Sequence, residues 1–152
     1  MTLADLIAPG RVIAEMRSHE RFEAISELLG HLVASGAFPL ERSEAAMEAF
    51  RLREEECSTG IGRGIAVPHC FLPGLDEVVA VFGRSAEGID FQAVDHVPAR
   101  FIVLFMVPAA EHTLHLRTLA TIARDLGLAE ILARLADAAD EDDLLAVLSS
   151  LA

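Results

Sequence analysis

The sequence predicts an α/β fold, a single compact domain in which helices flank both faces of a mixed central β-sheet. Short β-branched runs alternate along the chain with stretches of helical periodicity, which is the pattern of this class. The run 100–107 is apolar almost throughout and lies between two prolines, so it is typical of a strand covered on both faces. The 152 residues contain no repeat, low-complexity tract or linker, so one domain is predicted over residues 1–152.

The first third of the chain is predicted to be mainly helical. A helical turn over residues 2–7 and a short strand at 12–13 come first. After Ser18, a suitable N-cap, apolar residues recur at three- and four-residue spacing, which indicates an amphipathic helix ending at Gly36. Ser43 is the expected N-cap of a second helix, which leads into the glycine-rich loop.

The rest of the chain is predicted to supply most of the sheet and three more helices. Strands are expected at residues 65–67, 78–82 and 100–107, and helices at roughly 111–126, 128–137 and 141–150. Gly83 is expected to end the second of these strands. In the helix over 111–126, Leu116 and Ala123 are expected to lie on the inward face with three other apolar residues.

Composition narrows the class of function. The net charge of −12 should repel nucleic acid and anionic membrane surfaces. The longest apolar run, at 101–107, is about a third of the ~20 residues that a membrane span requires. The N-terminus lacks the basic start and apolar stretch of a signal peptide, and two cysteines are too few for a disulfide framework. We therefore expect a cytoplasmic protein that neither inserts into membranes nor binds nucleic acid.

The segment from Cys57 to His69 carries most of the functional signal. Glycines at every second position, from Gly60 to Gly64, allow close backbone approach, and Pro68 restricts the backbone just before His69. The side chain of a histidine in this position has a restricted orientation, as a reactive imidazole requires. The loop is not a P-loop, because the chain has no lysine, and it lacks the dinucleotide-binding glycine spacing.

A second histidine is expected to lie near the first. His112 and His115 are three residues apart on one side of the helix over 111–126. If the strands at 65–67 and 100–107 are neighbours, their ends bring His69 and His115 together. The alternative is that His115 is a half-buried helical histidine with one hydrogen bond.

Three stretches of the sequence together resemble one protein family. They are Arg53-Glu54 with Ser58-Thr-Gly-Ile-Gly-Arg-Gly-Ile-Ala-Val-Pro-His69, Phe91-Gln-Ala-Val-Asp95 with Pro98, and Leu104-x-x-Val-Pro108 with His115-Leu-x-x-Leu-Ala-x-x-Ala123. They resemble the enzyme IIA domains of the fructose–mannitol type, which belong to the phosphoenolpyruvate-dependent sugar phosphotransferase system and include a free-standing nitrogen-regulatory branch. The similarity spans roughly residues 20–150.

The resemblance implies a phosphotransferase that works without metal or other cofactor. His69 would accept a phosphoryl group from the phosphocarrier protein HPr. The group would then pass to a IIB domain, or the phosphorylated state would signal to a regulatory target. Histidine suits this task because its neutral ring is a nucleophile near neutral pH. An apolar patch with an acidic rim would meet a basic face of HPr, and a homodimer is compatible with the family.

The resemblance also implies roles for the neighbours of His69. His115 would hydrogen-bond the phosphoryl oxygens or hold the ring, and Arg53 would neutralise charge. The phosphoryl-binding loop would add hydrogen bonds from Ser58, Thr59 and the amide of Gly60. The alternative for Arg53 is an ion pair with the glutamates at 54–56 on a solvated helix end, and Ser58 and Thr59 would then only shape the turn.

The chain departs from its relatives beside the loop. Cys57 and Cys70 stand where many relatives have glycine, and Phe71 replaces a basic residue. Two further functions therefore stay open. One is a regulatory module that binds a target without onward transfer, which the lack of an attached IIB or IIC segment favours. The other is a metal or redox sensor, if both cysteines converge with His69 and His115. In the simplest account the cysteines are small fillers that trim access to His69.

Overall fold

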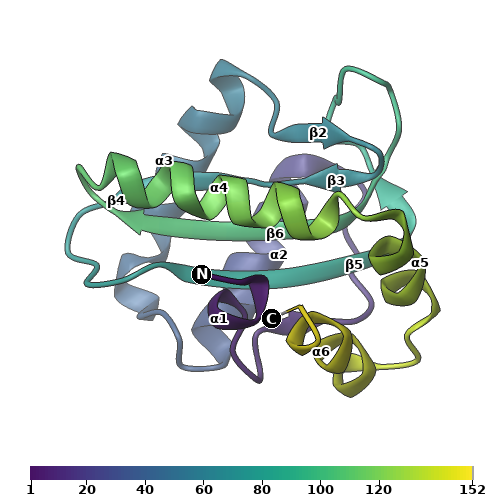
Figure 1. Ribbon diagram of the computed structural model, residues 1–152. Coiled ribbons are helices and arrows are strands. Elements are labelled where there is room, and N and C mark those ends of the chain that lie inside the picture. Colours follow the sequence, from purple (N-terminus) through teal and green to yellow (C-terminus); the bar gives the residue numbers. More distant parts are fainter. Residues whose placement is uncertain (152) are drawn as a thin grey trace.

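The computed structural model describes residues 1–151 and consists of one six-stranded sheet with helices packed on it (Figure 1). The strands are β1 (Val12–Ile13), β2 (Gly60–Gly62), β3 (Ile65–Ala66), β4 (His69–Leu72), β5 (Val79–Ile89) and β6 (Ala99–Pro108). The helices are α1 (Leu3–Leu6), α2 (Arg21–Ala34), the 3-10 helix η1 (Leu40–Arg42), α3 (Ser43–Glu56), α4 (His112–Leu126), α5 (Ala129–Asp137) and α6 (Glu141–Ser149). Within residues 1–151, no helix combines the length and apolar character needed to cross a membrane.

The sheet is mixed, and its centre is the antiparallel pair β5–β6. The strand order is β1-β5-β6-β3-β2, and β4 also pairs with β6. β3 and β4 both run parallel to β6, one beside its first half and one beside its second, so they form a single line that is broken at Val67 and Pro68. The break is held in place because the Phe105 amide donates to the Pro68 carbonyl at 3.0 Å. The predicted α/β class with a mixed sheet is confirmed.

Each face of the sheet carries its own apolar core. Along β6, Ile102, Leu104 and Met106 belong to the core beneath α2 and α3. The alternate side chains, among them Phe101 and Phe105, belong to the core shared with α1, α4, α5 and α6. Figure 1 shows α4 in front of the sheet and α2 behind it. The prediction that this strand is covered on both faces is confirmed.

The expected helix starts need two corrections. Glu20, not Ser18, caps α2, since its carboxylate accepts from the amides of Phe22 and Glu23. The Ser18 hydroxyl donates to Glu27 instead, at 2.6 Å. Ser43 is not a cap either, because η1 brings the chain to it already in helical conformation (φ −60°, ψ −42°). Capping propensity is local, whereas these starts are set by how the preceding segment arrives.

The strand predicted to end at Gly83 continues to Ile89. At Gly83 the backbone of β5 lies close to α2, because a Cβ there would lie 2.9 Å from Leu28 Cδ2. Arg84 follows inside the strand, buried, and its guanidinium donates to three carbonyl oxygens, those of Ala14, Leu135 and Ala138. The polar residue therefore does not interrupt the strand.

The inward face of α4 also differs from the prediction. Leu116 is 65% exposed and Ala123 is exposed, while Thr118, Thr121 and Asp125 are buried. The threonine hydroxyls donate to carbonyls of their own helix. The Asp125 carboxylate accepts from the amide of Leu3 in α1 at 3.0 Å. Polar groups that find partners in this way can occupy a buried face that an apolar pattern alone assigns to leucine.

Candidate functional site

His69 is the first residue of β4, directly after the break in the strand line. It lies opposite Phe105 of β6, and the two rings are stacked with centroids 5.2 Å apart and planes 13° apart. Its Nδ1 lies 2.7 Å from the Val67 carbonyl oxygen. The backbone before His69 is fixed, since the Val67 amide donates to the Thr59 carbonyl at 2.9 Å. The imidazole is therefore held by its own local backbone and by the neighbouring strand.

The hydrogen bond from Nδ1 selects the tautomer of His69. A carbonyl oxygen only accepts, so Nδ1 carries the proton and the lone pair of the neutral ring is on Nε2. The side chain is 7% exposed, and this burial lowers the pKa of His69 to about 4. The bond to Val67 opposes that shift, while the charges of Arg53 and His115 add to it. At neutral pH the ring is therefore uncharged.

His115 lies beside His69, with ring centroids 4.8 Å apart. Its Nε2 is buried and has no hydrogen-bond partner in the part of the chain that the structure describes. Burial, Arg53 and His112 lower the pKa of His115, so this ring too favours the neutral form. The expected meeting of the two histidines is observed. A buried ring nitrogen without a protein partner is unusual, and it can hydrogen-bond a group that enters the cavity.

Aromatic rings extend the site beyond the two histidines. Phe71 contacts His112 and His115, with centroids 5.1 Å and 4.9 Å away. The rings of His112, Phe71, His115, His69 and Phe105 thus form one continuous run. The sequence placed Phe71 in the expected apolar patch around His69, as an exposed residue, whereas it is half-buried, and it gave Phe105 no place in the site. For Phe71 the signal is the two-residue period of a strand, which puts it on the same face as His69.

A cavity of about 430 Å³ opens over this cluster, at the free edge of β4. It is lined by Ala49, Leu52, Arg53, Glu56, His69, Cys70, Phe71 and His115. The lining comes from α3, β4 and α4, so both faces of the sheet edge reach it. Of the predicted residues, the structure brings His69, His115 and Arg53 together here. Leu52 and Glu56 were not predicted, although both lie on the same turns of α3 as Arg53.

Arg53 is not occupied by the neighbouring glutamates. Its Nη1 donates to the Cys57 carbonyl at 2.9 Å, and it makes no ion pair within residues 1–151. Glu54 is buried and bound to Thr59, while Glu55 pairs with Arg51. The alternative in which the following acidic residues neutralise Arg53 therefore does not hold, and its charge remains available to the cavity.

Ser58, Thr59 and Gly60 lie outside the cavity lining, and each makes an internal hydrogen bond. The Ser58 hydroxyl donates to the Phe91 carbonyl and accepts from the Gly60 amide at 3.0 Å. The Thr59 hydroxyl donates to the Glu54 carboxylate at 2.6 Å. Their role in binding phosphoryl oxygens stays a prediction. Ser58, Thr59 and Gly60 would have to give up these internal hydrogen bonds to bind a phosphoryl group.

The alternating glycines instead fit the loop at 91–98. A Cβ on Gly60 would lie 3.0 Å from that of Ala93. Gly62 has φ +88°, and a Cβ there would lie 3.1 Å from Asp95 Oδ2, which accepts from the Arg63 amide at 2.8 Å. The glycine-rich stretch and the 91–98 stretch, two of the three family motifs, thus pack against each other. This close packing explains why glycine is needed at positions 60 and 62.

Cys70 lines the cavity beside His69 and His115, but Cys57 does not, so the two cysteines do not converge on the histidines together. Cys57 is exposed at the end of α3, whereas Cys70 is 4% exposed, and burial raises the pKa of its thiol to about 12. Cys70 follows His69 in β4 and packs with the α2–α3 core on the other face. Across residues 1–151, no three His, Cys, Asp or Glu side chains are grouped so that they could hold a metal ion. The convergence that the sensor hypothesis requires is absent from the structure.

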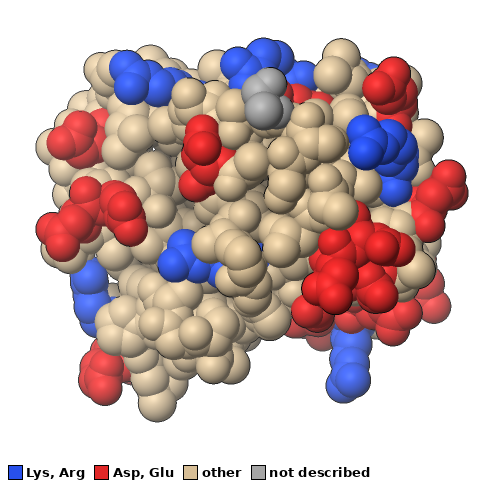
Figure 2. Space-filling model, turned by 60° about the horizontal axis from the view of Figure 1, so that its bottom comes forward, with Lys and Arg blue, Asp and Glu red and all other residues tan. Residues whose placement is uncertain are grey.

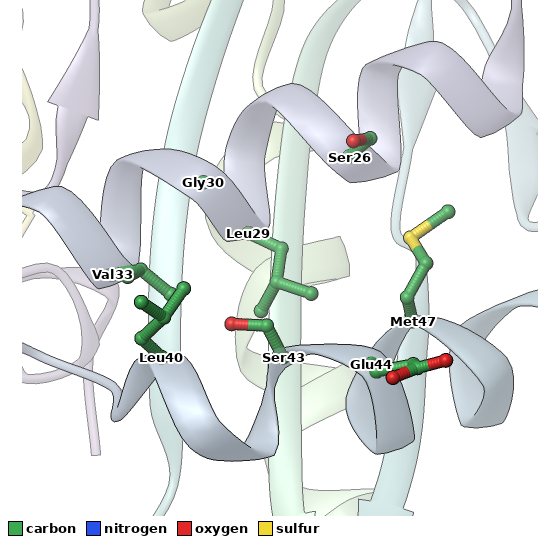
Figure 3. A pocket seen from close by; sticks show the side chains of 8 residues that line it. All are labelled: Ser26, Leu29, Gly30, Val33, Leu40, Ser43, Glu44 and Met47. Carbon is green, nitrogen blue, oxygen red and sulfur yellow. The ribbon is translucent and has the colours of Figure 1, made fainter.

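A second cavity, of about 390 Å³, lies between α2 and α3. It is lined by Ser26, Leu29, Gly30, Val33, Leu40, Ser43, Glu44 and Met47. In Figure 3, Leu29 and Val33 of α2 point towards Ser43 and Leu40. The lining is mostly aliphatic and contains no histidine, cysteine or arginine, so it offers no nucleophile comparable to His69.

Known proteins resemble the chain over nearly its whole length. Residues 5–151 match the family described as phosphoenolpyruvate-dependent sugar phosphotransferase system, EIIA 2. The fructose-specific EIIA component of Haloferax volcanii is 36% identical over 126 residues, which cover 83% of this chain and 80% of that protein. The nitrogen regulatory protein of Bradyrhizobium diazoefficiens is 30% identical over 151 residues, which cover 98% and 95%.

Solved structures share the fold. Nitrogen regulatory protein IIA-Ntr from Neisseria meningitidis superposes with a TM-score of 0.84 at 23% identity, covering 96% of this chain and 98% of that one. Enzyme IIAMtl of Escherichia coli, in its complex with phosphorylated enzyme IIBMtl, superposes with a TM-score of 0.76 at 22% identity, covering 95% and 97%. At these identities the likeness concerns the fold alone. With the match over residues 5–151, the conclusion is that the chain belongs to the EIIA 2 family of the phosphoenolpyruvate-dependent sugar phosphotransferase system.

Proposed function

We propose that the protein is a phosphohistidine phosphocarrier in which His69 Nε2 accepts a phosphoryl group from phosphorylated HPr. The observation that carries the proposal is the hydrogen bond from His69 Nδ1 to the Val67 carbonyl. It leaves the lone pair of a neutral ring on Nε2, beside a cavity that also holds Arg53 and His115. A buried, uncharged and oriented imidazole is the form that attacks phosphorus.

In the transfer, the Nε2 lone pair forms a bond to phosphorus as the bond from phosphorus to the donor breaks. The electron pair of the broken bond returns to the donor, so no proton has to leave His69 in this step. The ring becomes positively charged as it forms the N–P bond, and the proton on Nδ1 remains bonded to the Val67 carbonyl. That bond strengthens as charge develops, which favours the phosphorylated state.

The incoming phosphoryl group brings negative charge to a buried place. Both neighbouring histidines are shifted towards the neutral form, so Arg53 is the cation among the cavity-lining residues that can offset this charge. The Nε2 of His115 has no partner in residues 1–151 and can donate a hydrogen bond to a phosphoryl oxygen. Preorganised donors of this kind stabilise the charge of a transferring phosphoryl group, and no metal is needed for that role.

The partners are proposed from surface character and from the relatives. Leu52, which lines the cavity, and Leu116, next to His115 in α4, are exposed, which gives the expected apolar patch for a docking protein. The net charge of −12 favours a basic face on the donor, and Figure 2 shows a cluster of acidic side chains on one face of the molecule. After HPr, the acceptor is a IIB domain, as in the complex of IIAMtl with IIBMtl, in the cytoplasm.

A regulatory output of the same site is the second candidate. The similarity to nitrogen regulatory proteins spans 98% of the chain, and it supports a role in which the phosphorylation state of His69 controls binding to a target protein. Both outputs begin with the same phosphorylation of His69, so they differ only in whether the phosphoryl group is passed on or retained as a signal.

Reconstitution tests the proposal. The protein is incubated with phosphoenolpyruvate, enzyme I and HPr, and phosphate is located by mass spectrometry under alkaline conditions. One phosphoryl group on His69 is expected. His69→Ala should take up none, His115→Ala should mainly slow onward transfer, and His19→Ala, an exposed histidine, should behave as the wild type. Phosphate on His115, or none from a competent donor, would refute the assignment.

A further inference from the structure

Glu54 is a buried carboxylate to which the proposed transfer assigns no task. It is 1% exposed, although it lies next to Arg53 near the end of α3. Its Oε1 accepts from the Thr59 amide at 3.0 Å, and its Oε2 accepts from the Thr59 hydroxyl at 2.6 Å. Arg21 of α2 lies 3.7 Å from Oε1 and is itself largely buried. Burying a carboxylate is costly, and this one is retained with two hydrogen bonds to a single residue.

The residue that Glu54 holds leads directly to His69. The Thr59 carbonyl accepts from the Val67 amide at 2.9 Å, and the Val67 carbonyl accepts from His69 Nδ1 at 2.7 Å. Pro68, between them, has a fixed φ, and its carbonyl accepts from the Phe105 amide at 3.0 Å. The direction of the Val67 carbonyl therefore depends on where Thr59 is held.

The same carboxylate also fixes the other side of the cavity. Arg53 and Glu54 are neighbours on the last turns of α3, with Arg53 at the cavity and Glu54 turned inwards. By binding Thr59, Glu54 ties the end of α3 to the strand that leads to His69. One buried group thus sets the relative position of the nucleophile and the cation.

We propose that Glu54 is a positioning residue that, through Thr59 and Val67, holds His69 in the tautomer with Nε2 unprotonated and at a fixed place relative to Arg53. The inference rests on the proposed function of His69 for its catalytic meaning. Its structural content, the tautomer, can be measured without any phosphoryl donor.

Four variants test the positioning role. Glu54→Gln removes the charge and keeps the shape, and Thr59→Val removes the hydroxyl. Thr59→Ser keeps a hydroxyl at this position, so it should retain the wild-type tautomer of His69 that Thr59→Val loses. Glu55→Gln is the matched control, because it removes the same charge from the next residue, which is exposed and paired with Arg51. Circular dichroism and thermal unfolding establish that each variant is folded, and Thr59→Val keeps the test valid if Glu54→Gln does not fold.

Nitrogen-15 NMR of the imidazole rings at pH 7 is the first readout. The wild type, Thr59→Ser and Glu55→Gln should show a protonated Nδ1 and an unprotonated Nε2 for His69. In Glu54→Gln and Thr59→Val, the share of the opposite tautomer should rise by about tenfold, as expected for the loss of a buried hydrogen bond. An unchanged His69 spectrum in both folded variants overturns the proposal.

The rate of phosphorylation by phosphorylated HPr is the second readout. It should fall roughly ten- to a hundredfold in Glu54→Gln and Thr59→Val at saturating donor, which is the effect of a misplaced reacting group. A slower rate with an unchanged tautomer also overturns the positioning role. If the wild type itself takes up no phosphate, the proposed function fails, while the NMR result still decides whether Glu54 positions His69.

Discussion

The glycine-rich loop at 58–64 and the cavity around His69 lie on the same side of β6 but differ in how their polar groups are used. In the loop, backbone and side-chain groups are paired, from the Ser58 hydroxyl to the Arg63 amide. In the cavity, His115 Nε2 has no partner in the described chain, and Arg53 keeps its charge unpaired. The loop is the more specific sequence motif, yet the groups free to act on a ligand lie in the cavity.

The difference shows what each part contributes. A loop held by several hydrogen bonds and fitted to the 91–98 segment stabilises and orients, because moving it would break these bonds together. A cavity that contains a buried nitrogen without a protein partner, here His115 Nε2, costs stability and gains affinity for a ligand that bonds it. Substitutions of the loop glycines should therefore act mainly on folding, whereas substitutions of Arg53 and His115 should act mainly on phosphoryl transfer.

The largest expected effect concerns the pH dependence of stability. The pKa of His69 is lowered from 6.5 to about 4 in the folded protein, so between these values the unfolded chain binds the proton more readily. The stabilising contribution of the neutral ring is complete above pH 6.5 and is lost as the pH falls towards 4. The loss is roughly 3 kcal/mol at most.

Urea unfolding at several pH values measures this contribution. The free energy of unfolding of the wild type should fall more steeply between pH 7 and pH 4 than that of His69→Gln. His19→Gln, which changes an exposed histidine, should follow the wild type. Parallel curves for the wild type and His69→Gln would show that His69 is not held neutral by the fold.

Gly62→Ala tests the loop side of the comparison. The backbone at Gly62 has φ +88°, and a Cβ would lie 3.1 Å from Asp95 Oδ2. The variant should lose roughly 2 kcal/mol of stability from backbone strain and crowding. Phosphorylation per folded molecule should change less than twofold, because the cavity is untouched. A folded variant of wild-type stability that cannot be phosphorylated would reverse the division of roles between loop and cavity.

The two cysteines, one buried and one exposed, allow a third comparison of stability. Cys70→Ala removes a buried thiol from the α2–α3 core and should cost about 1 kcal/mol. Cys57→Ala changes an exposed side chain and should stay within about 0.5 kcal/mol of the wild type. Chemical denaturation of the two variants measures both changes in the free energy of unfolding. Equal losses would mean that Cys57 has a partner or a packing role.

The smallest expected effect is a gain in stability. Gly30 lies within α2, and nothing lies within 4 Å of the position its Cβ would take. Gly30→Ala should therefore stabilise the protein by roughly 0.5–1 kcal/mol through helix propensity alone. Thermal unfolding should show a higher midpoint, and phosphorylation should be unchanged. A loss of stability would indicate that the second cavity needs an open wall at this position.

The sequence by itself determined the fold class and the β6 strand, and it predicted the meeting of His69 with His115 on the condition that their strands are neighbours, which the structure shows. These follow from local rules, because an apolar run between prolines fixes a strand and parallel neighbours align their ends. The glycine-rich loop and Pro68 likewise identified His69 as the histidine with restricted aim, and the structure gives that restriction a physical form in the bond to Val67.

Only the tertiary structure decided which groups have partners. Ser18 is a good N-cap by type, but Glu20 takes that place because of the direction in which the chain arrives. By sequence Glu54 is one of three consecutive glutamates, yet it is buried because Thr59 and Arg21 meet it there. Leu116 fits a helical apolar stripe but faces outwards, since α1 supplies a partner for a polar residue on the opposite face. Propensity and periodicity are properties of neighbouring residues, whereas hydrogen-bond partners, burial and pKa arise from segments that are far apart in the chain.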